Sequence, residues 1–323
     1  MSIGSDEYHQ PRGSWTAIHC YLPRSEQTNY LVNRVRPIVD RGQFGRFFFL
    51  RYWKGGPHLR LRFGGLSSQA ADAVHRRLQD GMFSFSEDLQ LEYATEASYQ
   101  AKLAALENEP IEPIRRIGTV ELQPYIPEFG KYGGKQGIEL AEDLFSRTSQ
   151  QVLQVLTSVQ SHEPVGQAIE VMVSALRGVG LNLDECLVFL DGYIKWWVPY
   201  VPEPVLASWD RIGSEMRISL RAFTAGVWHN CEGSPFWQIY DHVFRKARSQ
   251  WLAQSSEHTM PNELTSAQEI TLAGVPFLHC FGHYLHTTNN RLGLSPASEA
   301  LAGYLLYTAL SDIKIHETLK EDR

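Results

Sequence analysis

The pattern of apolar residues changes once along this chain, and that change constrains the fold more than any other feature. In the first third, short segments such as "WTAIHCYL" alternate apolar and β-branched residues with polar ones, as half-buried strands do. From Ile138 onward, apolar residues recur at helical spacing almost to the end of the chain. The sequence therefore predicts an α+β fold, with antiparallel hairpins and interposed helices first and a mainly helical part after them.

The same change suggests how the chain is organised. We expect a flexible N-terminus over residues 1–14, because this stretch has no apolar core of its own. A single domain is predicted over residues 15–315, divided into a β-rich part (15–127) and a helical part (134–315).

Individual elements of the β-rich part follow from turn and capping signals. The segments "RFFFLRYW" and "HLRLRF" flank a Gly-Gly-Pro turn and predict a β-hairpin. Helices are expected over 24–42, with Ser25 as the N-cap, and over 67–81. Two more strands are predicted around 83–93 and 117–125.

One helix of the second part contains a proline. The segment "SAQEITLAGVPFLHCFGHYLHTTNNRLG" has helical periodicity, and Pro276 is expected to bend or interrupt it.

Composition excludes several classes of protein. A net charge of -6 over 323 residues argues against a broad nucleic-acid-binding surface. No apolar run approaches the roughly 20 residues of a membrane span. The four cysteines are far apart and form no CxxC pair, so we expect a reducing cytoplasm as the location.

Three clusters of residues suggest chemistry, and the first is the strand "HLRLRF". Side chains alternate faces along a strand, so His58, Arg60 and Arg62 point the same way. Two guanidinium groups on one face can hold carboxylates or phosphates in a bidentate manner. The alternative is a solvated outer face on which the arginine stems cover apolar neighbours.

The second cluster is the loop "PEFGKYGG", which carries Glu128, Lys131 and Tyr132 ahead of two glycines. Glu128 and Lys131 form either a surface ion pair of small energetic value or an acid/base carboxylate beside a cation.

The third cluster is "HCFGHYLHTTNNR", in which His279, His283 and His286 share one helical face. Such spacing suits zinc, but no HExxH glutamate is present and we expect no metal site. One histidine is expected to be functional, and Asn290 and Arg291, one turn beyond His286, are candidates to orient it. The aromatic segment from Tyr193 to Tyr200 reads as core, or as the wall of a peptide groove.

In series, three segments resemble the C-terminal domain of lantibiotic dehydratases and related stand-alone proteins of thiopeptide-type bacteriocin biosynthesis. They are "FFFLRYWKGGPHLRLRF", "YIPEFGKYGGKQGIELAEDLFSRTS" and "HTTNNRLGLSPASEALAGYLL", in the family's order over about residues 45–310. The resemblance implies a lyase that acts on a ribosomally made precursor peptide and uses no cofactor.

Two chemistries share this family's fold. In the first, glutamate is eliminated from a glutamylated Ser or Thr, which leaves dehydroalanine or dehydrobutyrine; this is the function we expect. In the second, a pyridine synthase joins two dehydroalanines by a formal [4+2] cycloaddition, with loss of water and the leader peptide. A non-catalytic scaffold that binds the leader peptide is a lesser alternative.

The resemblance also implies roles for individual residues. Arg60, Arg62, Glu128 and His286 match the catalytic positions of the elimination branch, and Lys131 stands where the family has an arginine. Thr148-Ser149 replaces the family's usual Asp-Ser. The residues expected to bind substrate are His58, Arg51, Tyr132, Asn290 and Arg291.

The expected partners follow from the same chemistry. They are the precursor peptide, with its leader and core, and a separate protein that glutamylates it from glutamyl-tRNA. Neither nucleic acid nor a membrane is expected to bind directly, and a homodimer is a further possibility.

Overall fold

The computed structural model describes residues 15–42, 44–82, 84–156, 164–230, 235–255, 267 and 270–321. The described chain falls into two compact units. The N-terminal unit comprises the residues up to Ile126 together with Leu156, and the C-terminal unit comprises the other described residues from Pro127 onward.

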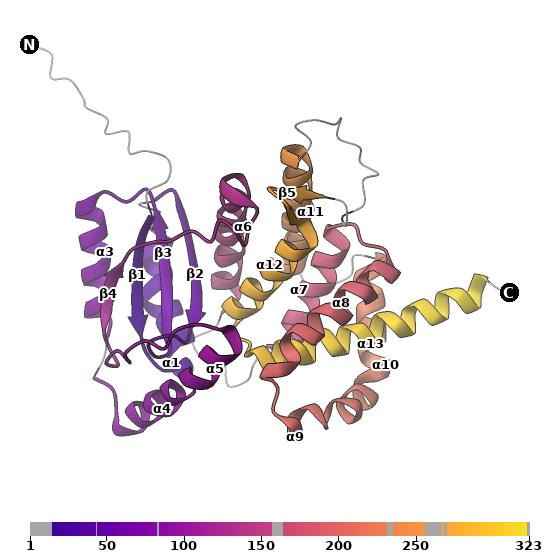
Figure 1. The fold of residues 1–323 in the computed structure, drawn as a ribbon, viewed down its shortest axis with the longest axis horizontal. Helices are drawn as coiled ribbons and strands as arrows, with labels where there is room; N and C mark the ends of the chain where they lie inside the picture. The colour runs from indigo at the N-terminus through magenta and orange to yellow at the C-terminus, as the bar shows by residue number, and fades with distance from the viewer. Residues whose placement is uncertain are drawn as a thin grey trace, which may run out of the picture. The chain divides into compact units, whose positions relative to one another are not determined.

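The N-terminal unit is built on an antiparallel sheet with the strand order β2-β3-β1-β4 (Figure 1). Its strands are β1 (Trp15–Tyr21), β2 (Arg46–Tyr52), β3 (His58–Gly64) and β4 (Val120–Gln123). The predicted hairpin is confirmed, because β2 pairs with β3 from Arg46↔Gly64 to Tyr52↔His58. The strand predicted around 117–125 is also confirmed, as β4.

One face of this sheet is the core of the unit. Most of its side chains are apolar and almost fully buried, including Ile18, Phe49 and Leu61. Helices α1 (Arg24–Tyr30) and α3 (Ser68–Asp80) pack against the sheet, and the Tyr30 hydroxyl donates a hydrogen bond of 2.7 Å to the carbonyl of Leu78. Burial of aromatic and branched side chains on one face is the main force that holds such a sheet together.

Two sequence-based expectations for this unit are wrong in detail. The residues expected to form a strand around 83–93 belong mostly to helix α4 (Glu87–Ser98), followed by α5 (Gln100–Glu107). The side chain of Ser86 caps α4 by accepting a hydrogen bond from the backbone N–H of Leu89, and acidic residues fill the first turn.

The second wrong detail concerns the helix predicted over 24–42. It is α1, a π-helical segment (Leu31–Val35) and α2 (Arg36–Val39), and its N-cap is Pro23 rather than Ser25. The helix predicted over 67–81 is confirmed as α3, with Ser67 as its N-cap.

The C-terminal unit is almost entirely helical, which confirms the predicted α+β class (Figure 1). Its helices are α6 (Gly134–Val155), α7 (Val165–Gly178), α8 (Leu183–Trp197), a 3-10 turn (Val198–Tyr200), α9 (Glu203–Leu206), α10 (Trp209–Asn230), α11 (Pro235–Ser255), α12 (Phe277–Leu292) and α13 (Pro296–Glu321). Helix α13 packs against α7, α8 and α10, while α12 packs against α6 and α7.

Pro276 was expected to bend or interrupt a helix, and it interrupts the predicted helical segment, because α12 begins only after it. It is the N-cap of α12, and a short hairpin of β5 (Thr271–Leu272) and β6 (Val275–Pro276) precedes it. Gly274 turns this hairpin at a φ of +77°, a conformation that suits glycine. Residues 266, 268 and 269, where this helix was expected to begin, lie outside the described residues.

Candidate functional site

The polar face of the N-terminal sheet carries two arginines, each bound to a histidine. We call Arg60, Arg62, His19 and His58 the arginine face. In the sheet register, Arg60 of β3 lies opposite His19 of β1, and Arg62 lies opposite Ala17. The alternation predicted for "HLRLRF" is therefore confirmed, and β1 contributes to the same face.

The Gly-Gly-Pro turn before β3 fixes His58. The carbonyl oxygen of Gly56 accepts a hydrogen bond from His58 Nδ1 at 2.8 Å, so His58 Nε2 is free of a proton. That nitrogen accepts a hydrogen bond from Arg60 Nε at 3.2 Å. Gly56 has a φ of +105°, and a Cβ added there would lie 2.3 Å from the Tyr93 hydroxyl oxygen, so the turn requires glycine.

Arg62 is held in the same way by His19. Arg62 Nη2 donates to His19 Nε2 at 3.1 Å, and the rings of His19 and His58 stack with centroids 4.8 Å apart. Arg60 also lies over the ring of Tyr52, with its guanidinium carbon 3.4 Å from the centroid. Stacking and hydrogen bonding together fix the guanidinium planes before any ligand arrives.

Burial and the neighbouring guanidinium groups keep both histidines neutral. Burial first, and then the charge of Arg60, lowers the pKa of His58 to about 3. Burial first, and then His58 and Arg62, lowers the pKa of His19 to about 2. Two cations held by neutral acceptors give this face a positive charge that suits an anion with carboxylate groups.

Glu121 of β4 is a carboxylate on this face, since it lies opposite His19 in the register. It forms an ion pair with Arg115 at 3.3 Å and accepts a hydrogen bond from the Tyr21 hydroxyl at 3.2 Å. Burial lowers the pKa of Arg62 to about 10, with a smaller contribution from Arg60, so Arg62 remains a cation at neutral pH.

Two residues predicted to bind substrate from this unit occupy interior positions. His58 is fully buried and supports Arg60 from behind, so it offers no surface for a ligand. Arg51 lies opposite Leu59, on the core face of the sheet, and donates to Gln27 Oε1 and Thr28 Oγ1 at 3.4 and 3.1 Å. An odd-numbered position on β2 points away from the arginine face, which explains the difference.

The "PEFGKYGG" loop belongs to the C-terminal unit and is anchored at Tyr132. The Tyr132 ring is buried and stacks on Tyr284 of α12 at 5.7 Å, which again leaves no surface for substrate. Lys131 forms an ion pair with the exposed carboxylate of Glu128 at 3.4 Å, which is the first of the two interpretations of their spacing, a surface ion pair. Burial first, and then the positive charge of Lys131, lowers the pKa of His283 on α12 to about 2.

Glycines let this loop pack closely. Gly133 has a φ of +77°, and a Cβ added there would lie 2.8 Å from the ring of Trp251 and 2.9 Å from the carbonyl oxygen of Leu272. The "GG" of the motif is therefore a packing requirement of the C-terminal unit.

His286 lies in a second cluster, which we call the histidine–glutamate cluster and which consists of Tyr193, His286, Asn289 and Glu299. His286 Nδ1 lies 2.9 Å from Glu299 Oε2. The other carboxylate oxygen of Glu299 accepts hydrogen bonds from Asn289 Nδ2 at 3.2 Å and from the Tyr193 hydroxyl. The side chain of Glu299 is 1% exposed, while that of His286 is 26% exposed.

An aromatic side chain fixes the plane of the His286 ring. Trp197 of α8 stacks on it with centroids 4.3 Å apart and an interplanar angle of 28°. The aromatic segment is thus core and also a wall beside His286. The arrangement resembles a general acid/base histidine oriented by a carboxylate.

The remaining predicted residues of α12 have other contacts. Arg291 is fully buried and donates to Thr148 Oγ1 at 3.0 Å. Glu299 on α13, and not Arg291, contacts His286. Asn290 is half-buried. His279 and His283 contact each other at 3.2 Å, and within the described residues no group of three His, Cys, Asp or Glu side chains is arranged to hold a metal ion.

Two residues of these clusters, His19 and Glu299, could not be identified from the sequence alone. His19 sits in an ordinary alternating strand, and Glu299 lies in "SPASEALAG", 13 residues after its histidine. Only the sheet register and the packing of α13 on its neighbours reveal them.

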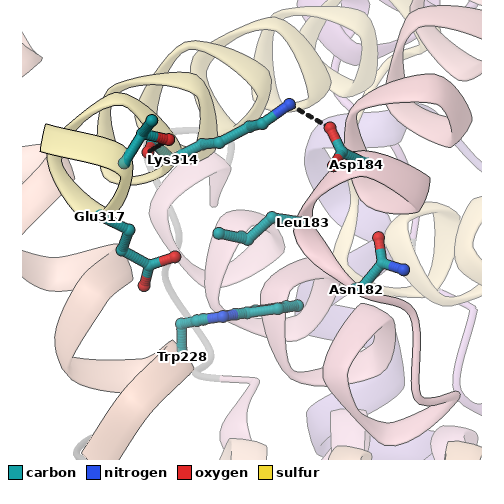
Figure 2. Close-up of a pocket in the computed structure, with 7 residues that line it drawn as sticks. Asn182, Leu183, Asp184, Trp228, Lys314 and Glu317 are labelled. Carbon is teal, nitrogen blue, oxygen red and sulfur yellow. Dashed lines mark hydrogen bonds and ion pairs between the residues drawn. The ribbon is translucent and has the colours of Figure 1, made fainter. Parts of the chain in front are cut away.

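A pocket of about 450 Å³, separate from both clusters, opens at the start of α8 (Figure 2). Figure 2 shows Lys314 of α13 reaching across to Asp184, with which it forms an ion pair. The pocket is lined by Asn182, Leu183, Asp184, Trp228, Lys314, Glu317 and Thr318. None of the predicted site residues lines this pocket.

Across the described ranges of the chain, no helix is long and apolar enough to cross a membrane.

Solved structures share this fold. The pyridine synthase TbtD from thiomuracin biosynthesis superposes with a TM-score of 0.72 at 17% identity, over 93% of this chain and 99% of that chain. TsrL gives a TM-score of 0.64 at 18% identity, over 93% of this chain and 95% of that chain. The tRNA-dependent lantibiotic dehydratase MibB from Microbispora sp. 107891 gives 0.54 at 20% identity, over 98% of this chain but 29% of that chain.

Sequence comparison identifies the family. No curated protein matches this sequence. The family described as "Lantibiotic biosynthesis dehydratase C-term" matches residues 15–310, which is most of the chain. The protein therefore belongs to the lantibiotic biosynthesis dehydratase C-terminal family.

Proposed function

We propose that this protein modifies a ribosomally synthesised precursor peptide by eliminating glutamate from glutamylated Ser or Thr residues, which produces dehydroalanine or dehydrobutyrine. The observation that carries the proposal is the arginine face, where Arg60 and Arg62 are held by neutral histidines. A departing glutamate carries two carboxylates, and two fixed guanidinium groups are suited to bind them.

In the proposed reaction, the Cα–H bond of the glutamylated residue breaks and its electron pair forms the Cα=Cβ double bond. The Cβ–O ester bond breaks at the same residue, and glutamate leaves as a carboxylate. The peptide α-proton is weakly acidic, so the reaction needs a positioned base and a cation for the leaving group.

We assign the proton transfer to His286. Its Nδ1 faces the carboxylate of Glu299, and its partly exposed ring presents Nε2 as the free nitrogen. Glu128 and Lys131 are assigned to the electrostatic environment of the reaction, since each matches a family motif position and they form an ion pair.

The substrate of this reaction must be made first. Glutamylation of the peptide is assigned to a separate protein that uses glutamyl-tRNA. MibB is named a tRNA-dependent lantibiotic dehydratase, and this chain spans 29% of it. The precursor peptide and the glutamylating protein are therefore the proposed partners.

A second candidate function is pyridine synthesis by cycloaddition of two dehydroalanines. The observation that favours it is the extent of the likeness to TbtD, which covers 93% of this chain and 99% of that one. Lys131, in place of the family's arginine, keeps the charge but lacks the bidentate fork, which is consistent with either chemistry.

One competition experiment separates these functions. The purified protein receives equal amounts of a glutamylated precursor peptide and of the same precursor bearing two dehydroalanines, and mass spectrometry follows both. Elimination predicts release of glutamate from the first peptide only. Cyclisation of the second peptide with release of its leader would establish the pyridine synthase, and binding of either peptide without any product would establish a leader-binding scaffold.

A further inference from the structure

We propose that Glu299 is a positioning residue that sets the tautomer of His286, by placing an acceptor opposite Nδ1 and thereby leaving Nε2 to take up the substrate proton. This inference rests on the proposed function for the catalytic use of Nε2. The tautomer itself does not depend on which reaction the protein catalyses.

The two oxygens of the Glu299 carboxylate have different partners. Oε1 accepts from Asn289 Nδ2 at 3.2 Å and from the hydroxyl of Tyr193. Oε2 lies 2.9 Å from His286 Nδ1. Because Oε1 is occupied by two donors, the carboxylate cannot rotate without breaking both hydrogen bonds.

Burial makes this arrangement strong and specific. Glu299 is 1% exposed and Tyr193 is also buried, so water does not screen the carboxylate. Burial first, and then the charge of Glu299, raises the pKa of Tyr193 well above its ordinary value, and the tyrosine therefore stays a hydrogen-bond donor at any working pH. A buried acceptor opposite Nδ1 stabilises the tautomer that carries its proton there.

Two contacts together fix the orientation of the His286 ring. Trp197 stacks on one side of it with centroids 4.3 Å apart, which fixes the ring plane. A flip within that plane would place Cδ2 in place of Nδ1 opposite Glu299 and lose the 2.9 Å contact, so the orientation with Nδ1 toward Glu299 is favoured. Orientation and tautomer of this kind are what a general base requires before substrate binds.

Replacing Glu299 with glutamine gives a sharp test, because the amide has one donor and one acceptor. Asn289 and Tyr193 both donate to the Oε1 position, so the amide oxygen occupies that position. The amide NH₂ group then faces His286 Nδ1 and requires Nδ1 to accept. The proton moves to Nε2, and the nitrogen needed for proton abstraction is blocked.

The experiment measures imidazole nitrogen shifts by NMR in the full chain labelled with ¹⁵N-histidine, in a mildly alkaline buffer where model imidazoles are neutral. The signal of His286 is assigned as the one lost in His286→Gln. The Nδ1–H tautomer is expected in the wild type and the Nε2–H tautomer in Glu299→Gln. Glutamate release by Glu299→Gln is expected to fall in kcat by about 10- to 100-fold, with KM changed less than about threefold.

The matched control is Asp312→Asn, which alters another buried carboxylate of α13, paired with Arg217 at 2.7 Å. This variant is expected to keep the wild-type tautomer and kcat. Should Glu299→Gln fail to fold, Glu299→Ala removes the acceptor opposite Nδ1, and kcat is expected to fall while the His286 signal shifts toward a mixture of tautomers.

The Nδ1–H tautomer persisting in Glu299→Gln, or an Nε2–H tautomer in the wild type, would overturn the inference. A tautomer that inverts as expected in a protein that releases no glutamate would leave the positioning role intact and reject glutamate elimination instead.

Discussion

The two clusters use histidine in opposite ways. On the arginine face, His19 and His58 lie beside guanidinium groups and accept hydrogen bonds from them. In the histidine–glutamate cluster, His286 lies beside a carboxylate and an indole ring. The residue type is the same, but the charge of its neighbour decides whether the imidazole is suited to hold a cation in place or to transfer a proton.

The neighbours of each histidine therefore distinguish His58, which positions an arginine, from His286, the candidate for proton transfer. His58 donates through Nδ1 to the carbonyl of Gly56 and accepts from Arg60 at Nε2, so both of its ring nitrogens are occupied and neither is available for proton transfer with a substrate. The role that we infer for His58 is to orient Arg60. His286, with a partly exposed ring and a buried carboxylate behind it, has the surroundings of a proton-transfer group.

The largest effect is expected for His286→Gln. Removing a general base lowers kcat by about 10²- to 10⁴-fold, and we expect glutamate release to fall within this range while the circular dichroism spectrum stays unchanged. The control is His242→Gln, which alters an exposed histidine of α11 and is expected to leave kcat as it is. If both variants retain wild-type kcat, His286 has no catalytic role.

A smaller effect is expected in the pH dependence of stability. The pKa of His58 is about 3 in the folded protein and near its ordinary value of 6.5 in the unfolded chain. The unfolded chain therefore binds a proton between these pH values that the folded protein does not, and the free energy of unfolding falls as pH decreases below 6.5. The slope from this residue is about 1.4 kcal/mol per pH unit.

Urea unfolding of the wild type and of His58→Gln measures this contribution. Glutamine keeps an acceptor for Arg60 but does not titrate. Between about pH 7.5 and pH 5.5 the wild type is expected to lose about 1.4 kcal/mol more than the variant. Parallel pH profiles for the two proteins would mean that His58 is not held neutral.

The sequence predicts the arginine face better than the histidine–glutamate cluster, for a physical reason. Strand alternation is local, so "HLRLRF" alone places Arg60 and Arg62 on one face, and the register confirms it. Glu299 reaches His286 from a different helix, and nothing within one helical turn of either residue indicates the pairing. His19 is likewise visible only through its cross-strand partner.

Local signals also explain where the elements were mispredicted. The segment around 83–93 has strand-forming aromatic residues, but Ser86 and two acids after it form a helix N-terminus that decides the outcome. Pro276 sits at the N-cap of α12, where its extended backbone ends a hairpin. In both places a capping residue outweighs the periodicity of the apolar residues.

The measurement that tests the central claim most directly is glutamate release by Arg62→Ala. Charge-assisted hydrogen bonds contribute about 1.5–3 kcal/mol each, so loss of one guanidinium is expected to lower kcat/KM for a glutamylated peptide by about 10- to 100-fold. The matched control is Arg76→Ala, an exposed arginine of α3, and thermal unfolding verifies that both variants fold. A wild-type rate in Arg62→Ala would contradict the account, and a loss confined to that variant is the result it predicts.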